Sequence, residues 1–131
     1  MATTRRRPTL EIDGRRLTLA KLRAFEAQRP VVRLAPAARK RMQSSVEAVA
    51  RAVASGEVCY GINTGFGAFA NRVIPTGKTR KLQLNLIRSH ACGVGESLPA
   101  PIVRRMLLLK ANALAAGFSG ARPLMADMLL G

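Results

Sequence analysis

The sequence predicts a mainly α-helical protein with one small β-hairpin near the N-terminus. Hydrophobic residues make up 48% of the 131-residue chain, yet only 4% of the residues are aromatic and none is tryptophan. A core must therefore be built from Leu, Val, Ala and Met, which favours helices packed against helices. The hairpin is predicted because apolar and polar residues alternate on both sides of Asp13-Gly14, a dipeptide typical of tight hairpin turns.

The chain is expected to consist of a basic arm and one helical segment. Residues 1–8 are polar and basic and end in proline, so we expect them to be disordered. The helical segment covers residues 9–131 and begins with the hairpin pattern at residues 9–19. Thr18 is placed to cap a short helix, and Pro30 must end that helix at or before the preceding residue.

Further helices follow a short extended stretch at residues 31–34. Pro36 opens a helix with an apolar stripe at steps of four, three and four, formed by Met42, Val46, Val49 and Val53. Gly56 is placed to end this helix in a left-handed conformation. The pattern also predicts helices over residues 78–91 and 100–116, and from Pro123 to the end of the chain. The last two are apolar on more than one face and need helical partners.

Charge and cysteine content bear on the possible partners. The formal net charge of +15 would suit a nucleic-acid binder, but the Lys and Arg residues are spread along the chain without interleaved stacking aromatics. Nucleic acid is therefore the weakest of the alternatives. Cys59 and Cys92 form neither a CxxC motif nor a Cys/His cluster, so we expect two reduced, half-buried thiols and no metal site.

Targeting signals are not evident in the sequence. Arg5-Arg6-Arg7 leads into a polar stretch and not into the apolar region of a signal peptide. The apolar stretches are too short to span a bilayer. We therefore expect a cytoplasmic protein without a membrane partner.

A glycine-rich loop, residues 60–67, is the strongest candidate for a functional site. Its sequence is YGINTGFG, in which three glycines alternate with a phenol, an amide and a hydroxyl. Such a loop could be an ordinary connection, or it could present Tyr60 and Asn63 to a small ligand. It lacks the spacing of a phosphate-binding loop, so nucleotide binding is not expected.

Three blocks of sequence together carry a resemblance to a known family. They are YGINTGFG at residues 60–67, LQLNL at residues 82–86 and SHACGVGE at residues 89–96. In order and spacing they resemble the N-terminal part of the histidine ammonia-lyases, within the aromatic amino acid ammonia-lyase family. Members of this family are several times longer than 131 residues, so the resemblance implies the helical N-terminal part of an ammonia-lyase fold, ending before the cofactor-forming loop.

The resemblance implies non-oxidative elimination of ammonia from L-histidine to give trans-urocanate. The family forms its electrophile, a methylidene-imidazolone, from an internal Ala-Ser-Gly tripeptide, and Tyr60 matches the family's catalytic base. The tripeptide Ala54-Ser55-Gly56 is expected to be a decoy, because it closes a helix and does not lie in a strained loop. The cofactor tripeptide is expected beyond Gly131, so this chain alone should be inactive, and the complete enzyme should be a homotetramer.

The remaining site residues also follow from the resemblance. Ser89-His90 matches the pair at which histidine lyases differ from tyrosine or phenylalanine lyases. The resemblance implies that His90 binds the substrate imidazole or assists proton transfer, and that Ser89 binds the substrate. Asn63 and Gly67 are also assigned to substrate binding, and they are expected to shape the loop. Gln83 and Cys92 are expected to be packing groups. The alternatives are a lyase for tyrosine or phenylalanine, and a stand-alone helical remnant or binding protein without activity.

Overall fold

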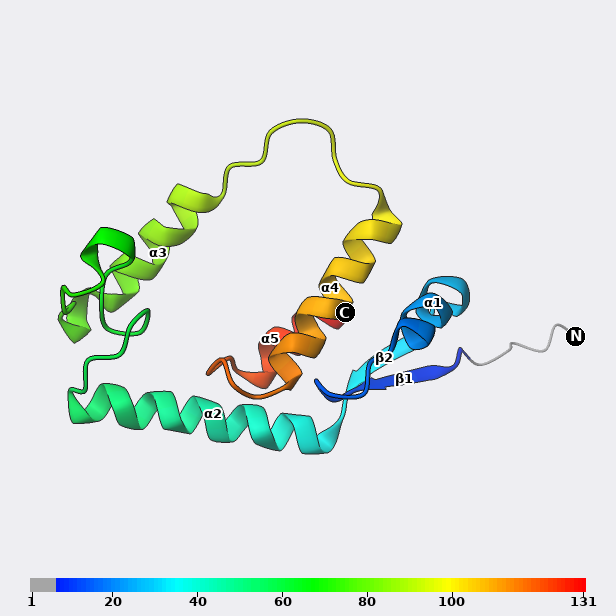
Figure 1. Ribbon diagram of the computed structural model, residues 1–131, viewed down its shortest axis with the longest axis horizontal. Coiled ribbons are helices and arrows are strands. Elements are labelled where there is room, and N and C mark those ends of the chain that lie inside the picture. The colour runs from blue at the N-terminus through cyan, green and yellow to red at the C-terminus, as the bar shows by residue number, and fades with distance from the viewer. Residues whose placement is uncertain (1–6) are drawn as a thin grey trace, which may run out of the picture. The chain divides into compact units, whose positions relative to one another are not determined.

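The computed structural model describes residues 7–131, with Thr76 described by its backbone alone. These residues form five α-helices, two short strands and two 3-10 turns, which confirms the mainly α-helical class (Figure 1). They group into two compact units, one reaching Glu47 and resuming from Leu98 to Gly131, and the other spanning Ala48–Ser97. Within the described residues, no helix has both the length and the apolar character needed to cross a membrane.

The predicted disordered arm, residues 1–8, lies largely outside the described residues, because the description begins at Arg7. The carbonyl of Pro8 accepts a hydrogen bond from the N–H of Val31, at 2.9 Å. Residues 1–6 are not described, so the arm stays a prediction.

The first unit begins with a parallel pair of strands, β1 (Thr9–Ile12) and β2 (Val31–Leu34). Helix α1 (Leu19–Gln28) forms the crossover that a parallel pair requires. The Thr18 hydroxyl accepts a hydrogen bond from the N–H of Lys21 at 3.3 Å, as predicted for a cap. The short helix and the extended stretch predicted on either side of Pro30 are therefore confirmed.

The hairpin predicted over residues 9–19 is wrong, because β1 pairs with β2 and not with the residues that follow it. A two-residue hairpin turn of the common type needs a positive φ at both central residues, and here only Gly14 has one, at 77°. The Asp13 carboxylate accepts hydrogen bonds from the N–H groups of Arg15 and Arg16, at 3.0 and 2.9 Å. These bonds, with the Arg16 side chain, hold the pKa of Asp13 well below its usual range.

Gly14 serves a close contact with a helix. Its N–H donates to Oδ1 of Asn112 at 3.0 Å, on α4 (Ala100–Ala115). A Cβ atom at Gly14 would lie 2.3 Å from the backbone nitrogen of Ala116. The Asp13-Gly14 turn therefore brings the chain against the C-terminal end of α4, which explains why the same dipeptide does not form a hairpin.

The core of the first unit lies among the strands and three helices. These are the N-terminal part of α2 (Pro36–Ser55), α4 and α5 (Pro123–Leu130), and α4 packs mainly on α5. The buried hydrophobic residues are Ile12, Leu34, Ala35, Ala38, Met42, Leu108, Ala111, Ala115 and Ala126. Because five of them are alanines, the backbones can approach closely and the core stays small.

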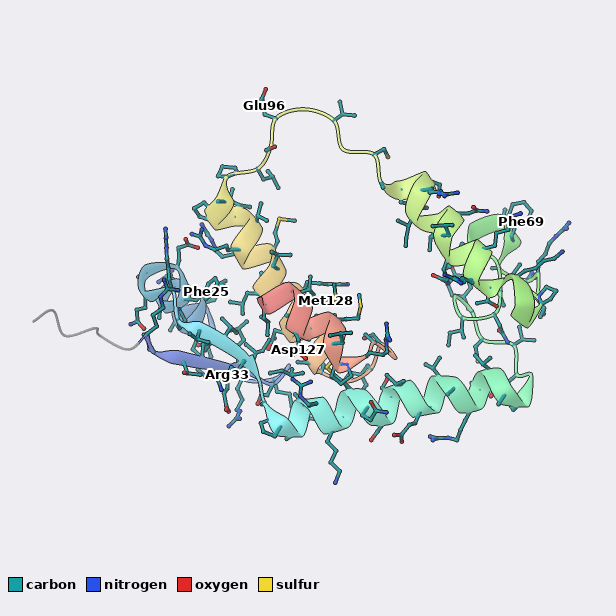
Figure 2. The ribbon with its side chains drawn as sticks, turned by 180° about the vertical axis from the view of Figure 1, so that it is seen from behind. Phe25, Arg33, Phe69, Glu96, Asp127 and Met128 are labelled. Atoms are coloured by element: carbon teal, nitrogen blue, oxygen red, sulfur yellow. The ribbon has the colours of Figure 1, made fainter. Side chains whose placement is uncertain are left out.

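Three ion pairs join elements of this unit, one of them between Arg105 of α4 and Glu26 of α1 at 3.4 Å. Arg39 of α2 binds Asp127 of α5 through two hydrogen bonds of 2.9 and 2.8 Å, which raise the pKa of Arg39 further above its usual value. Arg104 of α4 binds Glu26 of α1 at 2.7 Å. Figure 2 shows Asp127 beside Met128 on the short helix α5.

The second unit contains the glycine-rich loop. After the C-terminal part of α2 come two 3-10 turns, η1 (Gly67–Phe69) and η2 (Thr76–Lys78), and then α3 (Thr79–His90). The helices predicted from Pro36, at residues 78–91, at residues 100–116 and from Pro123 are thus confirmed to within a residue or two at their ends. Residues 91–97 leave α3 without regular structure.

Candidate functional site

The glycine-rich loop starts directly after the end of α2. Gly56 ends that helix with a φ of 75°, as predicted, and its N–H donates to the carbonyl of Val53 at 3.3 Å. Ala54 and Ser55 are helical, and the Ser55 hydroxyl donates to the carbonyl of Ala52 at 3.0 Å. The tripeptide Ala54-Ser55-Gly56 is therefore a capped helix end and offers no strained loop for cyclisation.

The far side of the loop is anchored by a short antiparallel bridge. Thr64 pairs with Val73, the N–H of Gly65 donates to the carbonyl of Arg72 at 3.0 Å, and the N–H of Ile74 donates to the carbonyl of Asn63 at 2.7 Å. This bridge gives residues 63–65 a fixed backbone. Side chains on it can therefore hold the rest of the loop.

Asn63 uses both ends of its side-chain amide within the loop. Its Oδ1 accepts a hydrogen bond from the N–H of Cys59 at 2.8 Å, and its Nδ2 donates to the carbonyl of Glu57 at 2.7 Å. The contacts described for Asn63 are thus those of a residue that shapes the loop, one of the two roles predicted for it.

Thr64 binds the backbone of Gly61, the residue that follows Tyr60. Its side chain is 1% exposed, and its hydroxyl accepts from the N–H of Gly61 at 3.1 Å and donates to the carbonyl of Gly65 at 3.0 Å. No role for Thr64 was predicted from the sequence. Its place in YGINTGFG, three residues after Gly61, was a signal for such a turn-closing hydroxyl.

Tyr60 lies at the exposed side of the loop, with 67% of its surface accessible. Its ring meets the ring of Phe66 edge to face, with centroids 6.3 Å apart and planes at 73°. Such a pair is favourable because the positive edge of one ring meets the negative face of the other. The phenol is therefore accessible to a ligand and is oriented by one aromatic neighbour.

Ser89 and His90 occupy the last turn of α3. The Ser89 hydroxyl donates to the carbonyl of Leu86 at 3.0 Å, and Nδ1 of His90 lies 2.9 Å from the same carbonyl. A neutral His90 ring that donates from Nδ1 leaves the lone pair of Nε2 free to accept a hydrogen bond. Both side chains are exposed.

A cavity of about 540 Å³ lies between the loop and α3. It is mainly apolar, and it is lined by Gly65, Phe66, Phe69, Arg72, Ile74, Leu82, Asn85, Leu86 and Ser89. Figure 2 shows Phe69 in this unit, and the guanidinium of Arg72 lies 5.6 Å from the centre of its ring. Leu82, Leu86 and Ser89 line one face of α3, as predicted from their helical spacing.

The cavity gathers few of the predicted site residues. Ser89 lines it, whereas Tyr60, Asn63, Gly67 and His90 are not among the described residues of its lining. Gly67 begins the turn η1 with a φ of 55°. No role for Asn85 was predicted from the sequence, although its position four residues before Ser89 places both on one face of the helix.

Two expected packing groups are corrected by the structure. Gln83 on α3 and Cys92 after the end of that helix are both exposed. Cys59 is half-buried, as predicted, but the same prediction for Cys92 is wrong. Among residues 7–131, no three His, Cys, Asp or Glu side chains come together as they would to hold a metal ion.

A second cavity, of about 920 Å³, lies in the first unit and contains none of the predicted site residues. Its lining includes Phe25, Arg33, Leu107 and Leu130, together with the Arg39–Asp127 ion pair. Its size alone does not make this cavity the functional site, because the predicted site residues Tyr60, Ser89 and His90 lie in the other unit.

Comparison with known proteins decides the family. The family described as "Aromatic amino acid lyase" matches residues 17–131. The chain belongs to the aromatic amino acid lyase family. Its similarity to individual lyases covers nearly the whole chain, but the chain spans only about a quarter of the length of these relatives, as the 24% coverage of the Anaeromyxobacter protein shows.

Individual relatives of this chain include two bacterial proteins. The chain is 48% identical over 122 residues, 93% of its length, to a histidine ammonia-lyase of Anaeromyxobacter sp. (strain K). It is 44% identical over 119 residues, 91% of its length, to a histidine ammonia-lyase of Geobacillus thermodenitrificans (strain NG80-2), of which it covers 24%.

Solved structures agree with this assignment. The histidine ammonia-lyase of Trypanosoma cruzi matches 93% of the chain with a TM-score of 0.80 and 34% identity, and the chain covers 24% of it. A tyrosine aminomutase of Streptomyces globisporus matches 94% of the chain with a TM-score of 0.82 and 29% identity, and the chain covers 23% of it. The helical N-terminal part of an ammonia-lyase fold, predicted from three short sequence blocks, is therefore confirmed.

Proposed function

We propose that this chain is the N-terminal segment of a cytoplasmic, homotetrameric histidine ammonia-lyase, which converts L-histidine to trans-urocanate and ammonia. The observation that carries the proposal is the place of Tyr60. It is exposed on a loop whose backbone is held on both sides, and the same unit presents Ser89-His90 at the end of α3. The 48% identity to a histidine ammonia-lyase supports the choice of substrate.

The reaction must remove a weakly acidic β-proton from the amino acid. A phenolate oxygen of Tyr60 can accept that proton once substrate lies within hydrogen-bond reach, and the exposure of the ring permits such an approach. His90 binds the imidazole of the substrate, because its free Nε2 lone pair can accept from the imidazole N–H. Ser89 holds the same turn through the carbonyl of Leu86.

The electrophile of the proposed reaction would come from residues outside this chain. A methylidene-imidazolone, when present, makes the amine a better leaving group. Ala54-Ser55-Gly56 does not fit its formation, because Gly56 closes α2 through a hydrogen bond to Val53 and Ser55 is bonded to Ala52. We therefore propose that the chain by itself has no lyase activity.

The proposal is tested in a chimera in which this chain replaces the matching quarter of the Anaeromyxobacter enzyme. The chimera should produce urocanate from L-histidine, measured by its absorbance, and the chain alone should not. Tyr60→Phe in the chimera should lower kcat by about 10²- to 10⁴-fold with little change in KM, because only the proton-transferring oxygen is removed.

Controls separate this proposal from the other functions considered. L-Tyrosine and L-phenylalanine are assayed beside L-histidine, and a preference for either would contradict the substrate assignment. A folded tetrameric chimera without activity would favour a non-catalytic remnant. Near-normal turnover by Tyr60→Phe would place the base elsewhere.

A further inference from the structure

Among residues 7–131, with the Thr76 side chain left aside, Thr64 is the one buried polar residue, with 1% of its surface exposed. Its hydroxyl has two hydrogen-bond partners: it accepts from the N–H of Gly61 at 3.1 Å and donates to the carbonyl of Gly65 at 3.0 Å. A buried hydroxyl that satisfies two backbone groups fixes the distance between them. Thr64 therefore fixes the backbone of the loop at Gly61, the residue that follows Tyr60.

Backbone hydrogen bonds hold Thr64 and its two neighbours in place. Its backbone pairs with Val73, and hydrogen bonds of 3.0 and 2.7 Å join the neighbouring Gly65 and Asn63 to Arg72 and Ile74. The Thr64 hydroxyl thus links the bridged residues 63–65 to Gly61, which does not belong to the bridge. The bridge therefore restricts the position of the Gly61 backbone through this hydrogen bond.

Tyr60 itself has little packing to hold it. Its side chain is 67% exposed, and the described ring contact is the edge-to-face pair with Phe66. The backbone before it is held by the Asn63 amide at Cys59, and the backbone after it by the Thr64 hydroxyl at Gly61. The carbonyl of Cys59 also accepts from the N–H groups of Ile62 and Asn63, at 3.1 and 3.2 Å. The direction of the phenol therefore depends on these backbone attachments, of which the Thr64 hydroxyl is the one described on the Gly61 side.

We propose that Thr64 is a positioning residue, whose hydroxyl orients the phenol of Tyr60 for proton transfer. This inference rests on the proposed function, in which Tyr60 is the base. Transfer requires the proton and its acceptor to come within hydrogen-bond reach, and a displacement of about 1 Å in an active site can cost about 10²-fold in rate. Losing the Thr64 hydroxyl frees the peptide at Gly61 and so increases the displacement of the phenol.

The first test needs no activity. Tyr60 is the only tyrosine of the chain and there is no tryptophan, so the intrinsic fluorescence of the protein reports on Tyr60. Thr64→Val keeps the shape of the side chain and removes the hydroxyl. It should increase the fast component of the anisotropy decay of Tyr60, whereas Thr64→Ser, which keeps the hydroxyl, should resemble the original chain.

Thr18→Val is the matched control. It makes the same substitution at a hydroxyl that also accepts a backbone N–H, from Lys21 at 3.3 Å, but in the other unit. It should leave the anisotropy decay of Tyr60 unchanged. An identical decay for Thr64→Val and the original chain would overturn the proposal.

The second test measures turnover in the chimera described above. Thr64→Val should lower kcat for L-histidine by about 10- to 100-fold and change KM by less than about threefold, because an orientation needed in the transition state is lost and binding is not. Thr64→Ser should restore most of the turnover. In the Tyr60→Phe background, Thr64→Val should cause no further loss, since the group that it positions is already absent.

The two proposals fail in different ways. If Tyr60→Phe alone retains turnover, the proposed function of Tyr60 is wrong. If Tyr60→Phe lowers kcat as expected, but Thr64→Val lowers kcat by the same factor with Tyr60 and with Phe at position 60, Thr64 acts on the fold and not through Tyr60.

A measurement on the unaltered chain covers the case in which Thr64→Val does not fold. The amide of Gly61 should exchange with deuterium at least about tenfold more slowly than the amide of Gly93, which lies exposed in the stretch after α3. Equal exchange of the two amides would show that the Thr64–Gly61 hydrogen bond does not persist, which would overturn the proposal.

Discussion

At the scale of single residues, the adjacent side chains of Ser89 and His90 differ in their surroundings. Both lie near the carbonyl of Leu86, which the Ser89 hydroxyl reaches at 3.0 Å and Nδ1 of His90 at 2.9 Å. Ser89 also lines the cavity beside the loop, whereas His90 faces another side of α3. His90 therefore has a ring nitrogen, Nε2, that the last turn of the helix does not occupy.

This position leads to a prediction about substrate choice. His90→Leu in the chimera should lower kcat/KM for L-histidine relative to L-tyrosine and L-phenylalanine by about 10- to 100-fold, because a hydrogen bond to the imidazole is lost and a polar substrate ring then meets an apolar side chain. Steady-state constants for the three substrates measure the change.

Gln83→Leu is the control for this substitution, because Gln83 is also exposed on α3 and carries no proposed contact with substrate. It should leave the ranking of the three substrates unchanged. An unchanged ranking for His90→Leu as well would make His90 a structural residue of the helix.

At the scale of elements, the contact between the turn after β1 and the end of α4 joins two segments that are far apart in the sequence. Gly14 donates to Asn112, and a Cβ at Gly14 would lie 2.3 Å from the nitrogen of Ala116. Real Cβ atoms do not approach backbone atoms so closely. The turn thus depends on a residue without a side chain, both for space and for its positive φ.

Gly14→Ala should therefore destabilise the first unit by at least about 2 kcal/mol, because it adds an overlap with helix backbone to the strain of a left-handed alanine. Gly56→Ala separates the two effects. Gly56 has nearly the same φ, 75° against 77°, but no atom within 4 Å of the added Cβ.

The Gly56→Ala substitution should cost only about 1 kcal/mol. Urea unfolding followed by circular dichroism measures both variants, with the slope of each transition as a check on the extent of unfolding. Equal losses at the two positions would mean that the contact of Gly14 with α4 does not limit stability.

At the scale of the whole molecule, apolar side chains remain exposed on the last two helices. Met106 and Leu109 of α4 are 54% and 47% exposed, and Leu124 and Met128 of α5 are 53% and 70% exposed. Exposed apolar groups favour association, while the net charge of +15 opposes it through repulsion between copies. The balance between these terms depends on salt, because salt screens the repulsion.

We therefore expect the chain to self-associate as concentration rises, and more strongly at high ionic strength than at low. Sedimentation velocity over a range of protein and salt concentrations measures this. Replacing Met106 and Met128 by Gln should reduce association, whereas Val94→Gln, at a fully exposed position outside the helices, should not. A single sedimenting species with the mass of a monomer at all concentrations would contradict this expectation.

The sequence by itself determined the helices, and it predicted which residues form the candidate site. Thr18, Pro30, Pro36 and Gly56 set helix boundaries within a turn of their own positions, because capping and ring constraints act between neighbours in the chain. The helical spacing likewise placed Leu82, Leu86 and Ser89 on one face of α3, and the structure shows that this face lines the cavity beside the loop. The order of three short motifs revealed the family. Each of these signals is local or rests on resemblance.

Only the tertiary structure decided what depends on partners distant in the sequence. The pairing of β1 with β2, in place of the predicted hairpin, follows from the crossover through α1 and from the contact of Gly14 with α4. The exposure of Gln83 and the burial of Thr64 were likewise invisible in the residue types, because burial is a property of the surroundings and not of the side chain. The same polar residue can be solvated on a helix or satisfied inside a loop, and only the position of its neighbours determines which.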